Sequence, residues 1–328
     1  MANLKGLLLI ACSCLLTSAY AQSSLIKIDG SSTVFLVTDA VIEEFKSANK
    51  SVKATIGISG TGGGFKKFCR NELDVVNASR PISTKEMAAC KEAGVEYIEL
   101  PIGYDALTVV VNPKNTWLTS LSTKELKMMW EPAAQGKIRS WQQINPTFPD
   151  VRLKLYGAGS DSGTFEYFTA AINGKAGSSR GDYSPADDDY ETIDGVATNV
   201  NAIGYLGLPY FEANKQKLKG VAISWGDKNP IYPSANSVMD GTYQPLSRPI
   251  MIYVNAASLN KPEVKAFALY YLNNASKLFK KVKYVELPAN AYKLGLARIN
   301  NAMKGTSFGG EIQSGLKLED VMGRPMRQ

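Results

Sequence analysis

The sequence predicts an α/β protein of two lobes, with a mostly parallel sheet wrapped by helices and a ligand cleft between lobes joined by crossing strands. Three strand–turn–helix units follow one another within about ninety residues, an order typical of such sheets. Two long apolar strands, at 106–111 and 249–254, then bracket a self-contained α/β segment. A chain that crosses into a second lobe and returns has this pattern, and ligands favour the cleft between lobes.

The first unit begins with the alternating residues 25–28, which predict a short strand, followed by a turn over 29–32. Apolar residues then recur at helical spacing, at Val34, Val37, Val41 and Phe45. In the second unit, a strand over 51–59 precedes the turn GTGGG, and FKKFCRNE is expected to open a helix.

The third unit has a strand over 73–77 and a helix started by Ser83 and Glu86, which have the spacing of a capping box. Beyond the apolar strand at 106–111, Ser122 and Glu125 repeat that spacing. Four further elements are predicted: a strand over 151–156, a loop over 173–189, a strand over 202–208 and a helix over 262–278. The predicted division is 22–111 plus 250–328 for the first lobe and 112–249 for the second.

The N-terminus has the pattern of a cleaved secretory signal over residues 1–21. Lys5 is its only charge, 7–16 is apolar, and Ala19-Tyr20-Ala21 fits a cleavage site. A lipoprotein site at Cys12 is the alternative, although the apolar segment before it is short. No later stretch reaches the roughly 18 uninterrupted apolar residues that a membrane span requires.

The mature chain would keep two cysteines, Cys69 and Cys90. In an oxidising compartment a single disulfide between them is expected, and two reduced buried thiols are the alternative. The net charge of the whole chain is +7, which favours anionic ligands. Because no stripe of Lys and Arg with interleaved aromatic residues is present, nucleic acid is not expected as a partner.

Histidine is absent from the chain, which excludes a Ser-His-Asp triad, a Cys-His pair and a histidine-ligated metal site. The segment GSDSG fails the nucleophile-elbow pattern because aspartate stands at its centre, and no phosphate-loop or dinucleotide fingerprint occurs. The run Asp187-Asp188-Asp189 is interpreted as a solvated loop or a loose cation site. We therefore expect no catalytic residue, no metal and no cofactor.

One device does recur: after a strand comes a turn of small hydroxyl residues at the start of a helix. It occurs at Ser31-Ser32-Thr33-Val34, at Ser59-Gly60-Thr61-Gly62-Gly63 and at Asp161-Ser162-Gly163-Thr164. Helix N-termini offer unpaired N–H donors and partial positive charge, and Ser and Thr add O–H donors. Ordinary helix capping explains one such turn, but three at strand ends in two lobes indicate a shared anion. Arg80 would add a full positive charge, unless it is a surface arginine.

These segments resemble a known family, the periplasmic phosphate-binding proteins that serve the high-affinity phosphate ABC transporter (PstS type). The similarity runs from about Ser24 to the C-terminus and is carried by six segments: IDGSSTVFLVTDAV, GISGTGGGFKKFC, NASRPIS, YDALTVVVN, YGAGSDSGTFEYF and NAIGYLGLPYF. The resemblance implies the two-lobed type II solute-binding fold, closing on phosphate by domain motion.

The resemblance also implies which residues bind the ligand. The family's phosphate-binding threonine and the next backbone N–H fall on Thr33 and Val34, beside Ser32. Its glycine-rich-turn serine falls on Ser59, with Thr61 as the alternative because the turn is one residue longer here. Its second-lobe motif falls on Ser162, Gly163 and Thr164.

Two positions depart from the family pattern. Where the best-known members have a carboxylate that accepts the proton of HPO4 2−, this chain has Arg80, and where they have an arginine it has Ala158. The charges look exchanged between the lobes, with Asp161 available as the acceptor beside Ser162. A carboxylate facing the ligand would reject sulfate, which has no proton to offer.

The resemblance implies a monomeric receptor in the periplasm that binds inorganic phosphate, passes it to membrane ABC permease subunits and performs no chemistry. The sequence leaves three other functions open: a receptor for another tetrahedral oxyanion such as sulfate, a secreted phosphatase using Ser162 or Thr33, and an adhesin that has kept the fold.

Overall fold

We describe residues 25–313 and 318–328 of the protein in a computed structural model. The predicted signal peptide and Cys12 lie outside these residues. The strands are β1 (Leu25–Gly30), β2 (Lys53–Ile56), β3 (Val75–Ala78), β4 (Tyr97–Val111), β5 (Ser120–Ser122), β6 (Lys154–Ala158), β7 (Ser184–Ala186), β8 (Ala202–Gly207), β9 (Lys219–Gly220), β10 (Ala222–Ser224) and β11 (Ser247–Asn255).

The helices alternate with the strands in the first two-thirds of the chain and dominate the last third. They are α1 (Ser32–Ala48), α2 (Gly60–Phe68), α3 (Thr84–Glu92), α4 (Thr123–Trp130), α5 (Gly163–Asn173), α6 (Asp189–Ala197), α7 (Leu208–Ala213), α8 (Ala235–Met239), α9 (Pro262–Lys281), α10 (Ala289–Asn300) and α11 (Leu318–Met322), with short 3-10 turns η1 (Pro132–Ala134) and η2 (Ala257–Asn260).

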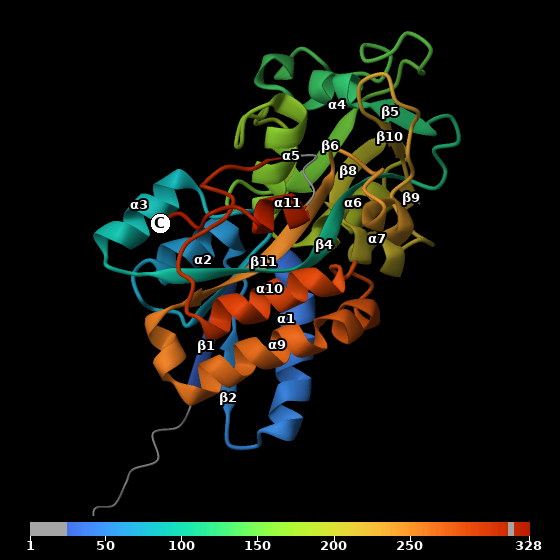
Figure 1. The fold of residues 1–328 in the computed structure, drawn as a ribbon. Helices are drawn as coiled ribbons and strands as arrows, with labels where there is room; N and C mark the ends of the chain where they lie inside the picture. Colours follow the sequence, from blue (N-terminus) through green and yellow to red (C-terminus); the bar gives the residue numbers. More distant parts are fainter. Residues whose placement is uncertain (1–24, 314–317) are drawn as a thin grey trace, which may run out of the picture.

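A continuous path of strands runs through the molecule in the order β2-β1-β3-β11-β4-β8-β6-β7. Strand β1 is parallel to β2 and β3, and β6 is parallel to β8 and β7, whereas β11 and β4 are antiparallel to their neighbours. The predicted mostly parallel sheets are therefore present on either side of an antiparallel centre. Figure 1 shows β4 and β11 running side by side between the two halves of the molecule.

Two separate hydrophobic clusters define the two lobes. One is formed by buried residues between positions 26–102 and 250–322, and the other by residues between 106 and 246, joined by Val285. We call the parts packed around them lobe I and lobe II. Along the chain, the buried residues change from the lobe I cluster to the lobe II cluster a few residues before the predicted division after Val111. The two lobes share β4, which is one unbroken strand of 15 residues.

The structure tests three predictions of where a helix begins. The capping boxes at Ser83 with Glu86 and at Ser122 with Glu125 are confirmed, with both reciprocal hydrogen bonds in each. The turn predicted over GTGGG is wrong, since α2 already begins at Gly60. Packing overrides the poor helix propensity of glycine here: a Cβ atom on Gly64 would lie 2.7 Å from the Cα of Gly30, so only glycine lets α2 approach β1.

The Asp187-Asp188-Asp189 run is not simply a solvated loop, as the sequence had suggested. Asp188 is the N-cap of α6 and accepts a hydrogen bond from the Tyr190 backbone N–H, and Asp189 is half-buried in the first turn. Of the three aspartates, Asp187 and Asp188 are exposed.

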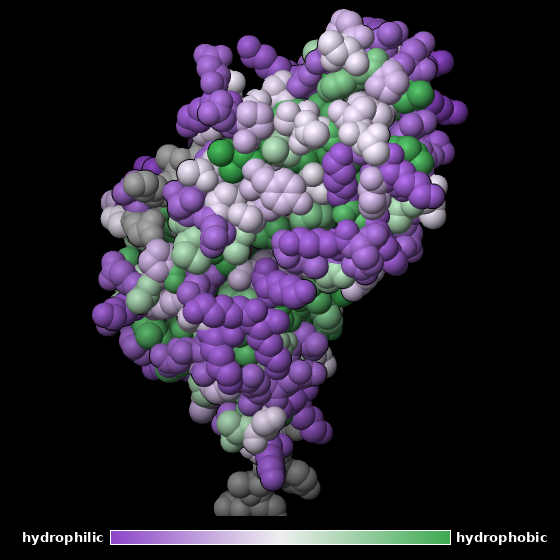
Figure 2. Space-filling view, turned by 90° about the vertical axis from the view of Figure 1, so that its right-hand side faces the viewer, coloured by the Kyte–Doolittle hydropathy of each residue, from purple (hydrophilic) through white to green (hydrophobic). Residues whose placement is uncertain are grey.

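The surface carries no broad apolar belt on the face that Figure 2 shows. Hydrophilic residues predominate over its lower part, where lobe I lies, and apolar residues form small groups among polar ones above. Of the helices within 25–313 and 318–328, none has the length and apolar character to cross a bilayer.

Candidate functional site

A cavity of about 270 Å³ lies between the lobes, where the helices α1, α2 and α5 begin. Both lobes contribute to its wall. The lining residues are Ser31, Ser32, Ile58, Ser59, Gly60, Thr61, Gly159, Asp161, Ser162, Ala186 and Asp187. A much smaller cavity adjoins it and shares Ser32 and Ser162 with it. We call it the inner cavity, because the buried Thr164 and the half-buried Asp189 also line it.

Three helix N-termini therefore face one cavity. The N-cap residues of α1 and α2, Ser31 and Ser59, make no side-chain cap hydrogen bond, so the first N–H groups of these helices lack a side-chain acceptor. At α5, the Ser162 hydroxyl caps the Thr164 N–H. The macrodipoles add partial positive charge at this point, which favours an anion.

Buried hydroxyl groups from the two lobes meet beside this cavity, and one of them, Thr61, also lines it. The Oγ1 atoms of Thr33 in lobe I and Thr164 in lobe II are 3.3 Å apart. Thr61 Oγ1 lies 3.2 Å from Ser79 Oγ, and an added Cβ on Gly163 would come within 2.5 and 2.6 Å of these two oxygens. The structure thus has the lobes in close contact at the predicted binding residues.

The other predicted hydroxyl residues lie at the wall of the cavity. Ser32 is half-buried at the first turn of α1, whereas the side chain of Val34 packs in the lobe I core and leaves only its backbone N–H for a ligand. Ser59 donates its hydroxyl hydrogen to Asp29 at 2.8 Å. Of the two residues left open by the sequence, Thr61 is therefore the one that lies against the second lobe.

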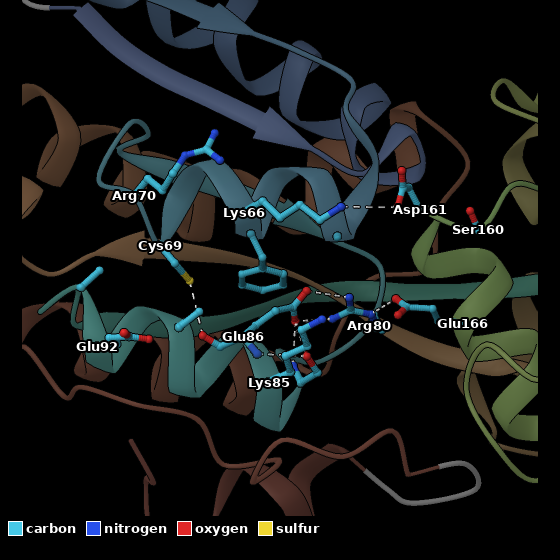
Figure 3. A pocket seen from close by; sticks show the side chains of 15 residues that line it. Lys66, Cys69, Arg70, Arg80, Lys85, Glu86, Glu92, Ser160, Asp161 and Glu166 are labelled. Carbon is cyan, nitrogen blue, oxygen red and sulfur yellow. Dashed lines mark hydrogen bonds and ion pairs between the residues drawn. The ribbon is translucent and has the colours of Figure 1, made fainter.

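Arg80 is placed differently from the sequence prediction. Its guanidinium is buried and bonds Glu86 through two 2.8 Å contacts, the Pro81 carbonyl oxygen, and Glu166 of lobe II through Nε. Figure 3 shows Arg80 between the two carboxylates, lining a separate groove of about 510 Å³. This geometry does not support a direct contact between Arg80 and the anion, because all three of its nitrogens already have partners.

Asp161 also lies apart from the buried hydroxyl groups. Its carboxylate is 73% exposed and pairs with Lys66 on the outer side of α2 at 3.7 Å, as Figure 3 shows, whereas its backbone carbonyl oxygen accepts from the Gly62 N–H at the start of the same helix. The side chain points to solvent because it occupies the turn before the α5 N-cap. A proton-accepting role at the inner end of the cleft does not fit this position.

Two charged residues at the cleft were missed by the sequence reasoning. Asp189 lines the inner cavity with Thr164, and burial together with the neighbouring Asp105 raises its pKa to about 7. Arg248, at the start of β11, is fully buried and donates to both Thr33 and Thr164. Asp189 was missed because it belongs to an acidic run that was interpreted as a solvated loop or a loose cation site. For Arg248, the sequence signal was a charged residue directly before an apolar strand.

Within the described residues, no group of three or more His, Cys, Asp and Glu side chains could hold a metal ion. The site instead offers hydroxyl and backbone donors from two lobes, which is the chemistry of reversible oxyanion binding.

Comparison with known proteins supports the same chemistry. Residues 17–275 match the family model described as the PBP superfamily domain. The chain is 45% identical over 318 residues to protein SphX of Synechocystis sp., covering 97% of this chain and 94% of SphX. It is 33% identical to the phosphate-binding protein PstS of Staphylococcus saprophyticus, covering 92% of this chain and 87% of PstS.

A solved structure is also similar across most of the chain. It is described as a possible phosphate-binding protein from Planctomyces limnophilus, with 43% sequence identity and a TM-score of 0.65. The match covers 86% of this chain and 99% of that one.

Proposed function

Because this chain belongs to the PBP superfamily domain family and is similar to protein SphX and to the phosphate-binding protein PstS, we propose that it captures inorganic phosphate in the cleft between its lobes. It acts as a periplasmic-type solute-binding protein and not as an enzyme. We further propose that it is exported by a cleaved signal over residues 1–21 and delivers phosphate to the membrane permease of an ABC transporter.

The observation that supports this proposal most strongly is the meeting of hydroxyl groups from both lobes at three helix N-termini. We assign phosphate contacts to Thr33, Thr61 and Thr164, to Ser32 and Ser162 at the wall, and to the backbone N–H groups of Val34 and Gly163. A handful of hydrogen bonds to a charged ligand, each worth roughly 1.5 to 3 kcal/mol, is enough for micromolar affinity after the entropy of binding is subtracted.

Titration calorimetry tests the function. The mature protein is unfolded and refolded to remove endogenous ligand, and phosphate is expected to bind one to one, with sulfate failing to compete at large excess. Equal competition by sulfate would favour the receptor for a different oxyanion. Hydrolysis of a chromogenic phosphate ester that disappears in Ser162→Ala would contradict a pure receptor.

We propose that Asp189, rather than the predicted Asp161, provides discrimination against sulfate. When ionised, its carboxylate can accept the proton of phosphate and repels sulfate, which has no proton. When protonated, it becomes a neutral donor that tolerates both anions. Because its pKa is about 7, the ionised form is the minority below that pH and the majority above it.

Sulfate competition against bound phosphate is therefore expected to be roughly tenfold stronger at pH 6 than at pH 8, in line with the change in the protonated fraction of Asp189. Asp189→Asn should raise sulfate competition at pH 8 and remove the pH dependence. Asp161→Asn is the matched control, since its exposed carboxylate should change neither. If Asp161→Asn raises sulfate competition and Asp189→Asn does not, the discrimination against sulfate belongs to Asp161.

The ion pair between Arg80 and Glu166 joins lobe I to lobe II and should stabilise the closed state. Glu166→Gln is expected to weaken phosphate binding about tenfold, mainly through faster release, since Arg80 keeps its bonds to Glu86. Stopped-flow release of phosphate measures the rate. Glu72→Gln, which breaks an exposed pair with Arg70 inside lobe I, should leave release unchanged. Equal rates for Glu166→Gln and the unaltered protein would show that the pair does not hold the lobes closed.

A further inference from the structure

The assignment of Arg80 to an ion-pair network leaves the bound anion without an obvious cation. Helix N-termini supply only partial charges, and Lys66, which pairs with Asp161 at the cleft, lies on the outside with an exposed side chain. The cation that contacts the phosphate-binding threonines is Arg248, on the strand β11 that passes between the lobes.

Arg248 connects the two lobes through its hydrogen bonds. Nη2 lies 2.9 Å from Thr164 Oγ1 in lobe II and 3.3 Å from Thr33 Oγ1 in lobe I. Nε and Nη2 both donate to Asp105 Oδ2, at 3.1 and 2.9 Å. The side chain is completely buried, and its position is further limited by the Tyr167 ring, whose centroid is 5.9 Å from Cζ.

These contacts determine what the threonine hydroxyls can do. A guanidinium only donates, and Nη2 has two hydrogens, one for Asp105 and one that the two hydroxyls share. Thr33 and Thr164 must therefore accept from Arg248, and their own hydrogens are turned away from it. The hydrogen of one hydroxyl can bridge the two oxygens, and the hydrogens of both can turn to an anion that enters between the lobes. Arg248 therefore makes one donor from each lobe available at the same place.

Nη1 provides a second, independent observation. Among the residues that the structure describes, this buried nitrogen has no hydrogen-bond partner. Buried donors of charged groups are rarely left unsatisfied, and an incoming oxyanion or its water would relieve the deficit.

Building on the proposed function, we infer that Arg248 is the cation of the phosphate site, holding Thr33 and Thr164 as donors and compensating the charge of the anion from behind them. In this role it is a positioning residue, and its charge acts on the ligand at short range in a buried environment. The competing explanation is purely structural: Arg248 would only neutralise the buried carboxylate of Asp105.

Paired variants separate the two roles. Arg248→Met combined with Asp105→Asn removes the cation without leaving Asp105 as an unpaired buried charge. If Arg248 serves the anion, this double variant should fold, as judged by circular dichroism, and bind phosphate about 100-fold more weakly than the unaltered protein in calorimetry. Binding within about threefold of the unaltered protein would overturn the inference.

Asp105→Asn alone keeps the test decisive if the double variant does not fold. It leaves Arg248 with an uncompensated charge, so phosphate affinity should be retained or increased. A loss of more than tenfold would favour the structural explanation, because it would show that binding needs the intact ion pair between Arg248 and Asp105.

Arg248→Lys, which keeps the charge, should retain more phosphate affinity than Arg248→Met. Failure of the unaltered protein to bind phosphate would instead contradict the proposed function.

Discussion

Replacing Gly163 with alanine is expected to weaken phosphate binding by about 10- to 100-fold, the range that follows from overpacking by one methyl group. The added methyl would lie 2.5 Å from Thr61 Oγ1 and 2.6 Å from Ser79 Oγ, both on the opposite lobe. The two oxygens are buried and hydrogen-bonded to each other, and Thr61 Cβ, which cannot turn away, would lie at 3.0 Å, so the lobes would have to separate. Calorimetry gives the affinity, and small-angle scattering with saturating phosphate should show a more open particle.

The ligand-free stability of this variant should change little, because the clash arises only when the lobes are closed. Gly62→Ala is the matched control on the facing helix α2. Its methyl group would lie 3.7 Å from the Asp161 carbonyl oxygen, an ordinary contact, and alanine favours a helix by up to about 1 kcal/mol over glycine. Unchanged affinity in Gly163→Ala would show that phosphate binds with the lobes further apart than in this structure.

Removal of the Cys69–Cys90 disulfide is expected to lower the free energy of unfolding by roughly 3 kcal/mol, from the entropy of closing a loop with a sequence separation of 21. For a chain of this size that corresponds to a fall in Tm of roughly 5 °C. The expected disulfide is present in the structure and links the end of α2 to α3. A Cys69→Ala/Cys90→Ala variant, followed by thermal unfolding, measures the loss.

Phosphate affinity should change by less than about threefold in the same variant, because Cys69 follows the last residue of α2 whereas the binding residues lie at its first turn. Reduced but otherwise unaltered protein should match the alanine variant in stability. Equal unfolding temperatures for the oxidised and reduced forms would contradict the prediction and indicate that the loop is already ordered in the unfolded chain.

Much of the fold could be predicted because periodicity and helix caps are local signals. Helix α9 extends only three residues beyond the predicted 262–278, and β11 contains the predicted strand at 249–254. The strand predicted at 106–111 is only the second part of β4, which starts at Tyr97. Its first part was missed because Glu99 and Pro101 break the apolar pattern, although both are buried in the fold. Glu99, for example, accepts hydrogen bonds from Thr306 and Ser307.

By itself the sequence determined the class of ligand. The absence of histidine, the hydroxyl residues at three helix starts and the family resemblance together pointed to an oxyanion receptor, because these are properties of short segments. Only the tertiary structure decided where the charged side chains lie relative to that site. Four charged residues follow or precede strands near the cleft: Arg80, Asp161, Asp189 and Arg248. Whether each side chain faces an ion-pair partner, solvent or the buried threonines depends on the packing of distant segments. Hydrogen bonds and burial are set by three-dimensional neighbours, so charge placement could not be obtained from spacing along the chain.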